Sequence, residues 1–203
     1  MDRSDFIRLL EKYTRSADIE SQEEMFELSI QDESIHDMDF SSYYLSFSWF
    51  ADNQFDSCTF HTTKLTDTNF CGNVFLNCQF SENSIRKADW DDLKFIHCSI
   101  VSLRAVRVSF LSIIMEDCEV RNAEFTRCYF DPLHQEGQED GHFSETFFRN
   151  CTFEDCTFED CSFEDCIFDS VEFIGCTFTN TEIDTANPGV HFTDCKFKNS
   201  GLS

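Results

Sequence analysis

Residues 151–165 read Cys-Thr-Phe-Glu-Asp, Cys-Thr-Phe-Glu-Asp and Cys-Ser-Phe-Glu-Asp, starting at Cys151 and ending at Asp165. The same five-residue spacing extends in both directions along the chain. Every fifth residue from Ile30 to Phe130 is apolar, 21 positions in succession. Because apolar residues make up 41% of the chain, such a series has a chance probability on the order of 10⁻⁸. A period of five matches neither the 3.6 of an α-helix nor the 2 of a β-strand.

The repeat continues in two shifted frames. The second frame runs from Phe143 to Ile183, and a short third frame contains Phe192, Phe197 and Leu202. A second position of each unit, two residues before the centre, holds mostly small residues. Eleven of the 12 cysteines occupy it: Cys58, Cys78, Cys98, Cys118, Cys128, Cys151, Cys156, Cys161, Cys166, Cys176 and Cys195. Each unit therefore offers one large and one smaller residue to an interior, and three residues to water.

These units resemble the pentapeptide repeat family, and the resemblance spans roughly residues 28 to 202. It implies an all-β fold, a right-handed quadrilateral β-helix in which four units form one square coil of 20 residues. About eight coils at the ~4.8 Å spacing of paired strands would make a rod of ~39 Å. The 20-residue coil implies two inward columns, one of Cys58, Cys78, Cys98 and Cys118, the other of Phe50, Phe70, Trp90, Phe110 and Phe130.

The ends and interruptions of the repeat define the domain organisation. Residues 1–27 form a lead-in, in which residues 4–15 are predicted as a short amphipathic helix with Ser4 as N-cap, covering the first coil. The β-helix follows over residues 28–202. Residues 131–142 break the frame and are expected to form an exposed loop. Residues 184–190, with Pro188 and Gly189, are expected to be a small insertion.

The net charge of the chain is -24, from 39 acidic and 15 basic residues. Such a balance argues against direct binding of nucleic acid or anionic lipid, because phosphate contacts require Lys and Arg. It favours a partner with a basic surface, or serves solubility alone. The first residues do not resemble a signal peptide, and no apolar stretch is long enough to span a membrane. We therefore expect a cytoplasmic protein.

The cysteines are predicted to be packing residues. Their spacings of five and 20 differ from the C-x₂-C spacing of metal sites, and parallel neighbours in a column suit a disulfide badly. Free buried thiols indicate a reducing compartment. Cys71 lies on an outward position and is predicted to be the one reactive thiol. The six histidines accompany no nucleophile motif or phosphate loop, so we expect no enzyme activity, no cofactor and no metal.

The acidic residues suggest a partner. Over ~39 Å, duplex DNA carries about 23 charges, and residues 28–203 carry a net charge of -20. The chain thus resembles the pentapeptide repeat proteins that bind DNA gyrase or topoisomerase IV as DNA mimics and protect them from quinolones or peptide toxins. The predicted partner-binding residues are Asp131, Glu136, Glu139, Asp140, Glu154, Asp155, Glu159, Asp160, Glu164, Asp165 and Asp169.

Alternatives remain open at this point. The acidic residues are equally well explained as a solvated surface, and a scaffold or immunity protein would bind a different basic partner. The repeat reads Cys-Thr-Phe-Glu-Asp, whereas the gyrase-binding members have repeats of the Ala-Asp-Leu type. The C-terminal dimerisation segment usual in the family is not apparent, so a homodimer through the C-terminal coil is also left open. Lys87, Arg107 and Arg127, spaced by 20, are expected to form a basic stripe that pairs with carboxylates such as Glu82 and Glu124.

Overall fold

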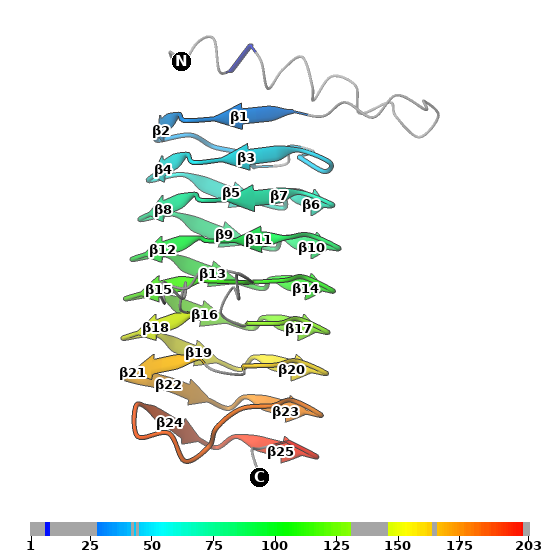
Figure 1. Cartoon of the computed structure of the whole chain (residues 1–203), viewed down its shortest axis with the longest axis vertical. Helices are drawn as coiled ribbons and strands as arrows, with labels where there is room; N and C mark the ends of the chain where they lie inside the picture. The colour runs from blue at the N-terminus through cyan, green and yellow to red at the C-terminus, as the bar shows by residue number, and fades with distance from the viewer. Residues whose placement is uncertain are drawn as a thin grey trace, which may run out of the picture.

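The computed structural model describes residues 7–8, 28–41, 43, 45–130, 146–163 and 166–200. From residue 28 onward these residues form a four-sided parallel β-helix, an upright stack of coils (Figure 1). The coils are residues 28–47, 48–67, 68–87, 88–107, 108–127, 128–160, 161–180 and 181–199, with the undescribed residues falling inside the first, sixth and seventh. The fold predicted from the repeat, an all-β solenoid of about eight coils, is confirmed.

Each side of the square is a parallel sheet, and we number the four faces in chain order. Face 1 contains β1 (Ser29–Gln31), β3 (Trp49–Ala51), β7 (Asn69–Cys71) and β11 (Trp90–Asp91), and continues through isolated bridges at Ser109, Tyr129, Ser162 and Glu182. Face 2 contains β2 (Ser34–His36), β4 (Gln54–Asp56), β8 (Val74–Leu76), β12 (Lys94–Ile96), β15 (Ile114–Glu116), β18 (Phe147–Arg149) and β21 (Ile167–Asp169).

Face 3 lies opposite face 1, and face 4 lies opposite face 2. Face 3 contains β5 (Thr59–His61), β9 (Gln79–Ser81), β13 (Ser99–Val101), β16 (Glu119–Arg121), β19 (Thr152–Glu154), β22 (Val171–Ile174) and β24 (Val190–Thr193). Face 4 contains β6 (Lys64–Thr66), β10 (Ser84–Arg86), β14 (Arg104–Val106), β17 (Glu124–Thr126), β20 (Thr157–Glu159), β23 (Thr177–Thr179) and β25 (Lys196–Lys198).

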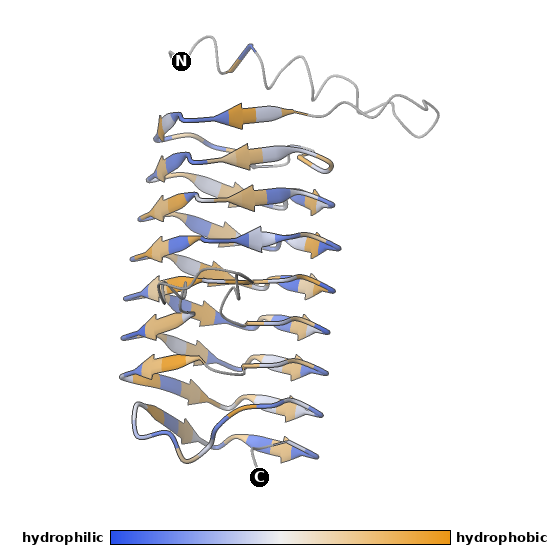
Figure 2. Ribbon diagram, in the orientation of Figure 1, coloured by the Kyte–Doolittle hydropathy of each residue, from blue (hydrophilic) through white to orange (hydrophobic). Residues whose placement is uncertain are grey.

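The repeat centres stack in columns through the interior. Strand pairing places Phe50 beside Phe70, and Phe70 beside Trp90, at an offset of 20 residues. Stacked rings such as Phe60 and Phe80 have centroids 4.6 Å apart, close to the spacing of neighbouring strands. The two columns predicted from the 20-residue coil are therefore confirmed. Figure 2 shows the resulting alternation of hydrophobic and hydrophilic residues along each coil.

The corners between faces are left-handed turns. The second residue after each centre has φ near +50° to +66°, and most of these residues are Asp, Asn or Ser, with glycine at positions 72 and 175. Asp and Asn tolerate this conformation better than most side chains. Backbone N–H groups at the corners donate to carbonyls of the next coil, as Asp52 does to Cys71 at 2.9 Å. The corners thus turn the chain from one face to the next, and their backbone hydrogen bonds link successive coils.

Two interruptions change the pairing register. Ile114 pairs with Phe147 at an offset of 33, since the frame break between Phe130 and Thr146 adds residues. The predicted loop 131–142 itself lies outside the described residues. Val171 pairs with Val190 at an offset of 19. Residues 184–189 therefore replace a strand of face 2 with turns, and they shorten this coil by one residue instead of forming the expected insertion.

The predicted N-terminal helix, 4–15, lies outside the described residues except for Ile7 and Arg8, which are helical. Among the described residues, no helix has the length and apolar character needed to cross a membrane.

Candidate functional site

The outward charges of the described rod differ from face to face. Each face is counted here together with the corner that follows it. Face 1 carries seven described carboxylates and no described Lys or Arg: Asp32, Asp52, Asp89, Asp91, Asp92, Glu182 and Asp184. Face 3 carries seven carboxylates and one cation: Asp39, Glu82, Glu119, Glu154, Asp155, Glu172, Asp194 and Arg121. Two opposite sides of the described rod are therefore strongly acidic.

The other two faces differ from these. Face 2 carries six carboxylates and two cations: Glu33, Asp37, Asp56, Glu116, Asp117, Asp169, Lys94 and Arg149. Face 4 carries eight cations and four carboxylates: Lys64, Arg86, Lys87, Arg104, Arg107, Arg127, Lys196, Lys198, Asp67, Glu124, Glu159 and Asp160. The sign of the surface therefore changes around the rod, although the chain as a whole is acidic.

Negative potential on face 1 is visible in its titrating groups. Burial, followed by the neighbouring Asp89 carboxylate, raises the pKa of Asp91. Burial and then the charges of Asp91, Asp92 and Asp52 raise the pKa of the Cys71 thiol. Because like charges disfavour ionisation, the carboxylates of face 1 add to the larger effect of burial in both shifts. The sequence-based site prediction missed this cluster. The one available signal in the sequence was that Asp52 and Asp92 are 40 residues apart, which is the length of two coils and places them on the same face.

The predicted partner-binding residues do not gather on one side. Glu154 and Asp155 lie on face 3, Glu159 and Asp160 on face 4, and Asp169 on face 2. Consecutive units turn the corner of the square, so residues that are neighbours in sequence point in different directions. The remaining predicted residues, Asp131, Glu136, Glu139, Asp140, Glu164 and Asp165, lie outside the described residues.

Three of the described residues in that set are already engaged by arginine. Arg121 Nε lies 3.1 Å from Glu154 Oε2, Arg149 Nε lies 3.4 Å from Asp169 Oδ2, and Arg127 Nε lies 3.8 Å from Asp160 Oδ2. Exposed pairs of this kind contribute little stability, commonly about 0–1 kcal/mol. They do reduce the negative charge that these carboxylates present to a partner.

Asp155 has a structural role at its corner. Its carboxylate lies over Gly175 in the next coil, where an added Cβ would clash with Asp155 Oδ1. Gly175 also has a positive φ of 64°. The glycine therefore permits both the left-handed corner and the close approach of the carboxylate.

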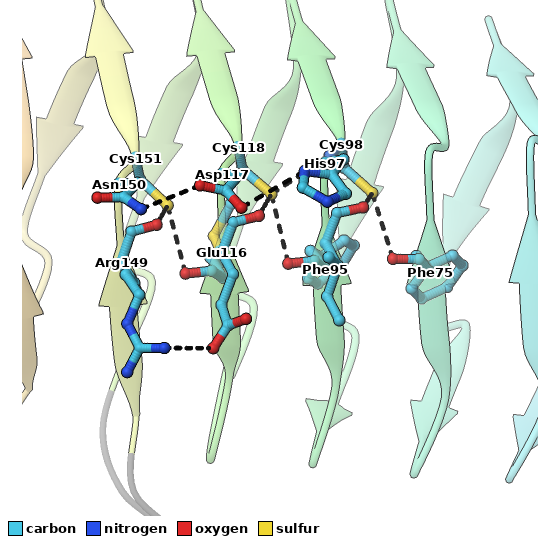
Figure 3. A network of polar contacts seen from close by, with 12 residues as sticks. Phe75, Phe95, His97, Cys98, Glu116, Asp117, Cys118, Arg149, Asn150 and Cys151 are labelled. Carbon is cyan, nitrogen blue, oxygen red and sulfur yellow. Dashed lines mark hydrogen bonds and ion pairs between the residues drawn. The ribbon is translucent and has the colours of Figure 1, made fainter.

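The cysteine column forms hydrogen bonds between coils (Figure 3). Cys98 Sγ donates to the Phe75 carbonyl at 3.4 Å, and Cys118 Sγ donates to the Phe95 carbonyl at 3.4 Å. Hydrogen bonding to Cys151 and to Cys98, together with burial, raises the pKa of Cys118. All 12 cysteines are free thiols, and no group of three or more potential ligands in the described part of the chain is arranged to hold a metal ion.

Polar contacts on the outside of the same coils run parallel to this column (Figure 3). His97 Nδ1 lies 3.5 Å from Asp117 Oδ2, and the Asn150 amide donates to Asp117 Oδ1 at 3.1 Å. Arg149 Nη1 lies 3.4 Å from Glu116 Oε1. These contacts join three successive corners and strands of face 2.

Comparison with known families agrees with the coil geometry. Residues 142–182 match the family model described as pentapeptide repeats, in 8 copies. This segment of the chain therefore consists of pentapeptide repeats. None of the curated proteins matches it in sequence.

Two solved structures are similar to this chain, and the first of them is a pentapeptide repeat protein. HetL, a protein involved in heterocyst differentiation regulation from the cyanobacterium Nostoc sp. strain PCC 7120, is 11% identical with a TM-score of 0.35; the match covers 100% of this chain and 95% of HetL. Full-length QnrB1, a plasmid-mediated fluoroquinolone resistance protein, is 17% identical with a TM-score of 0.32; the match covers 86% of each chain. Identities and TM-scores this low say nothing of the partner of this chain.

Proposed function

We propose that this protein is a non-enzymatic, cytoplasmic DNA mimic that binds the DNA-binding surface of a type II topoisomerase, DNA gyrase or topoisomerase IV, and confers drug or toxin resistance. The observation that supports the proposal is the pair of opposite acidic faces. Faces 1 and 3 together carry 14 described carboxylates and one arginine along the rod. Duplex DNA is likewise a stiff rod with a high density of negative charge along its axis.

The charge of these faces can be compared with that of DNA. Faces 1 and 3 have a combined net charge of -13 over the eight coils. Duplex DNA of ~39 Å carries about 23 charges, so the two faces present roughly half of that density. A surface that binds DNA through Lys and Arg would be attracted to such a rod, and the attraction would weaken with salt.

The cytoplasmic location is supported by the thiols. Eleven of the 12 cysteines occupy inward positions and none is in a disulfide, as expected in a reducing compartment. A homodimer through the C-terminal coil stays a prediction. The exposed Phe197 in that coil, 41% accessible, supports it.

A DNA gyrase supercoiling assay with the purified protein, with and without a fluoroquinolone, tests the proposal. We expect inhibition of supercoiling, or protection from the drug, at micromolar concentration or below. Asp89→Asn, Asp92→Asn and Glu182→Gln combined should weaken the effect at least fivefold, because three exposed charges of face 1 are lost.

The matched control is the combination of Ser34→Lys, Gln54→Lys and Asp37→Asn on face 2, which changes the net charge by the same three units. It should retain most of the activity if face 1 makes the contacts. Equal loss in both variants would show that only total charge matters. No effect of the native protein at high excess would contradict the proposal and favour a scaffold or immunity protein with another basic partner.

A further inference from the structure

Face 4 is the basic side of an acidic protein, and part of it is hollowed. A groove of about 310 Å³ runs along the rod beside the corner that follows face 4. It is lined by Arg86, Lys87, Val106, Arg107, Thr126, Arg127, Glu159 and Asp160, contributed by β10, β14, β17 and β20 and the corners that follow them. The cations lie in three successive coils, and the two carboxylates lie in the fourth.

Three of these cations have a left-handed backbone conformation, which is uncommon for Lys and Arg. Lys87, Arg107 and Arg127 have φ of 51°, 56° and 53°, and they are the only described Lys or Arg residues with positive φ. Other corners of the same column hold Asp67, Asp160, Asn180 and Asn199, residue types that tolerate this conformation, and Phe47 in the first coil. Long cationic side chains at three successive left-handed corners cost stability there. An outlier of this kind supports a functional role for the side chains.

The ion pairs of the described chain leave the middle of the groove positive. Arg127 lies 3.8 Å from Asp160 and Arg104 lies 3.5 Å from Glu124. Arg86, Lys87 and Arg107 have no carboxylate within 4.0 Å among the described residues. The pairing of the stripe with Glu82 and Glu124 that the sequence suggested is therefore wrong for Lys87 and Arg107. Glu124 lies beside Arg104 because both occupy the position before a centre, in neighbouring coils.

The surroundings of the groove limit its ligand to a short anion. Asp67 lies one coil before Lys87, Glu159 and Asp160 close the other end, and acidic faces 3 and 1 adjoin face 4 on its two sides. A long polyanion such as nucleic acid would meet these carboxylates. The groove covers four coils, or about 14 Å at the strand spacing, which is the length of about four residues of extended peptide at ~3.3 Å each.

We propose that the groove between Arg86, Lys87, Arg107 and Arg127 binds a short, extended segment rich in Asp and Glu from a partner protein. Two or three carboxylates of such a segment would lie against the unpaired cations, and arginine forms bidentate hydrogen bonds with carboxylates. Face 4 is separate from the acidic faces 1 and 3, so this site does not depend on topoisomerase binding.

A fluorescein-labelled peptide, Gly-Asp-Glu-Asp-Glu-Gly, tests the site by fluorescence anisotropy with the full chain in 100 mM salt. We expect saturable binding. The combination of Arg86→Gln, Lys87→Asn and Arg107→Asn should weaken it at least tenfold. The two asparagines suit the left-handed corners, so this variant should fold, and circular dichroism checks that it does.

The matched control, Lys64→Gln, Lys196→Gln and Lys198→Gln, removes three cations from the same face outside the groove. It should change the affinity less than twofold. An equal loss in both variants would overturn the proposal, because it would show general attraction to face 4. Absence of peptide binding would also overturn it, as would tighter binding of inorganic triphosphate than of the peptide in competition.

Discussion

At the scale of the residue, two buried inward side chains of the described structure have polar atoms without a hydrogen-bond partner, Asn83 and the indole nitrogen of Trp90. Asn83 is 2% exposed, and neither its side-chain oxygen nor its nitrogen has a hydrogen-bond partner in the described structure. By contrast, the buried Asn53 amide donates to the Ile30 carbonyl at 2.9 Å and to Asn73 Oδ1 at 3.0 Å. A buried amide without partners costs free energy that an apolar side chain of similar size would not.

Asn83→Leu should therefore raise the free energy of unfolding by about 1–2 kcal/mol. Leu103 occupies the same column one coil further on, so the column accommodates leucine. Urea denaturation measures the change. Asn53→Leu is the matched control and should destabilise the protein, because it removes satisfied hydrogen bonds. A destabilised Asn83→Leu variant would show that the Asn83 amide is engaged.

Cys71, which the sequence predicted to be the one reactive thiol, is exposed as expected, but we now expect it to react slowly. Burial and the carboxylates of Asp91, Asp92 and Asp52 raise its pKa, so less thiolate is present at neutral pH than for an ordinary cysteine. Asp92→Asn should lower this pKa and increase the rate of iodoacetamide labelling at pH 8 about twofold to fivefold. A plot of rate against pH should shift to lower pH. An unchanged plot would show that the Asp92 charge does not contribute to this pKa.

At the scale of the element, stability comes from the packing of coil on coil. Phe55 in β4 is fully buried and stacks on Phe75 in β8, with ring centroids 4.9 Å apart. Phe55→Ala should lower the free energy of unfolding by about 3–5 kcal/mol. Phe197→Ala, in the last coil, is the control and should cost less than half as much, because that ring is 41% exposed. Similar losses would argue against nearest-neighbour stacking.

The arrangement of the repeat units also explains why the inward residues could be predicted from the sequence and the candidate site could not. The period of five and the 20-residue coil placed Phe50, Phe70 and the cysteine column correctly, since inward positions depend only on local spacing. The candidate site was predicted from two sets of residues, the loop carboxylates between 131 and 140 and the nearly contiguous carboxylates between 154 and 169, and only residues of the second set are described. These lie on several faces because each unit turns a corner. A single face instead collects charged residues that are 20 positions apart in the sequence. The residue with which a charged side chain such as Arg104 forms an ion pair depends on which outward position of the unit each of them occupies.

At the scale of the whole molecule, the rod separates its charges by side. Faces 1 and 3 are acidic, face 2 carries outward apolar residues such as Leu76 and Ile96, and face 4 is basic. A rigid scaffold with a 4.8 Å repeat can hold such columns at fixed separation without a pocket. With the two proposals combined, faces 1 and 3 bind the DNA-binding surface of an enzyme, while face 4 binds an acidic segment of a protein.

The most direct test of DNA mimicry is displacement of a fluorescent duplex from DNA gyrase by the purified protein, followed by anisotropy. Mimicry predicts competitive displacement, with half of the duplex released at micromolar protein or below. The Asp89→Asn, Asp92→Asn and Glu182→Gln variant should need at least fivefold more protein. If gyrase keeps its duplex at high excess of the native protein, acidic faces 1 and 3 do not act as a DNA mimic toward this enzyme, and the proposed function is contradicted.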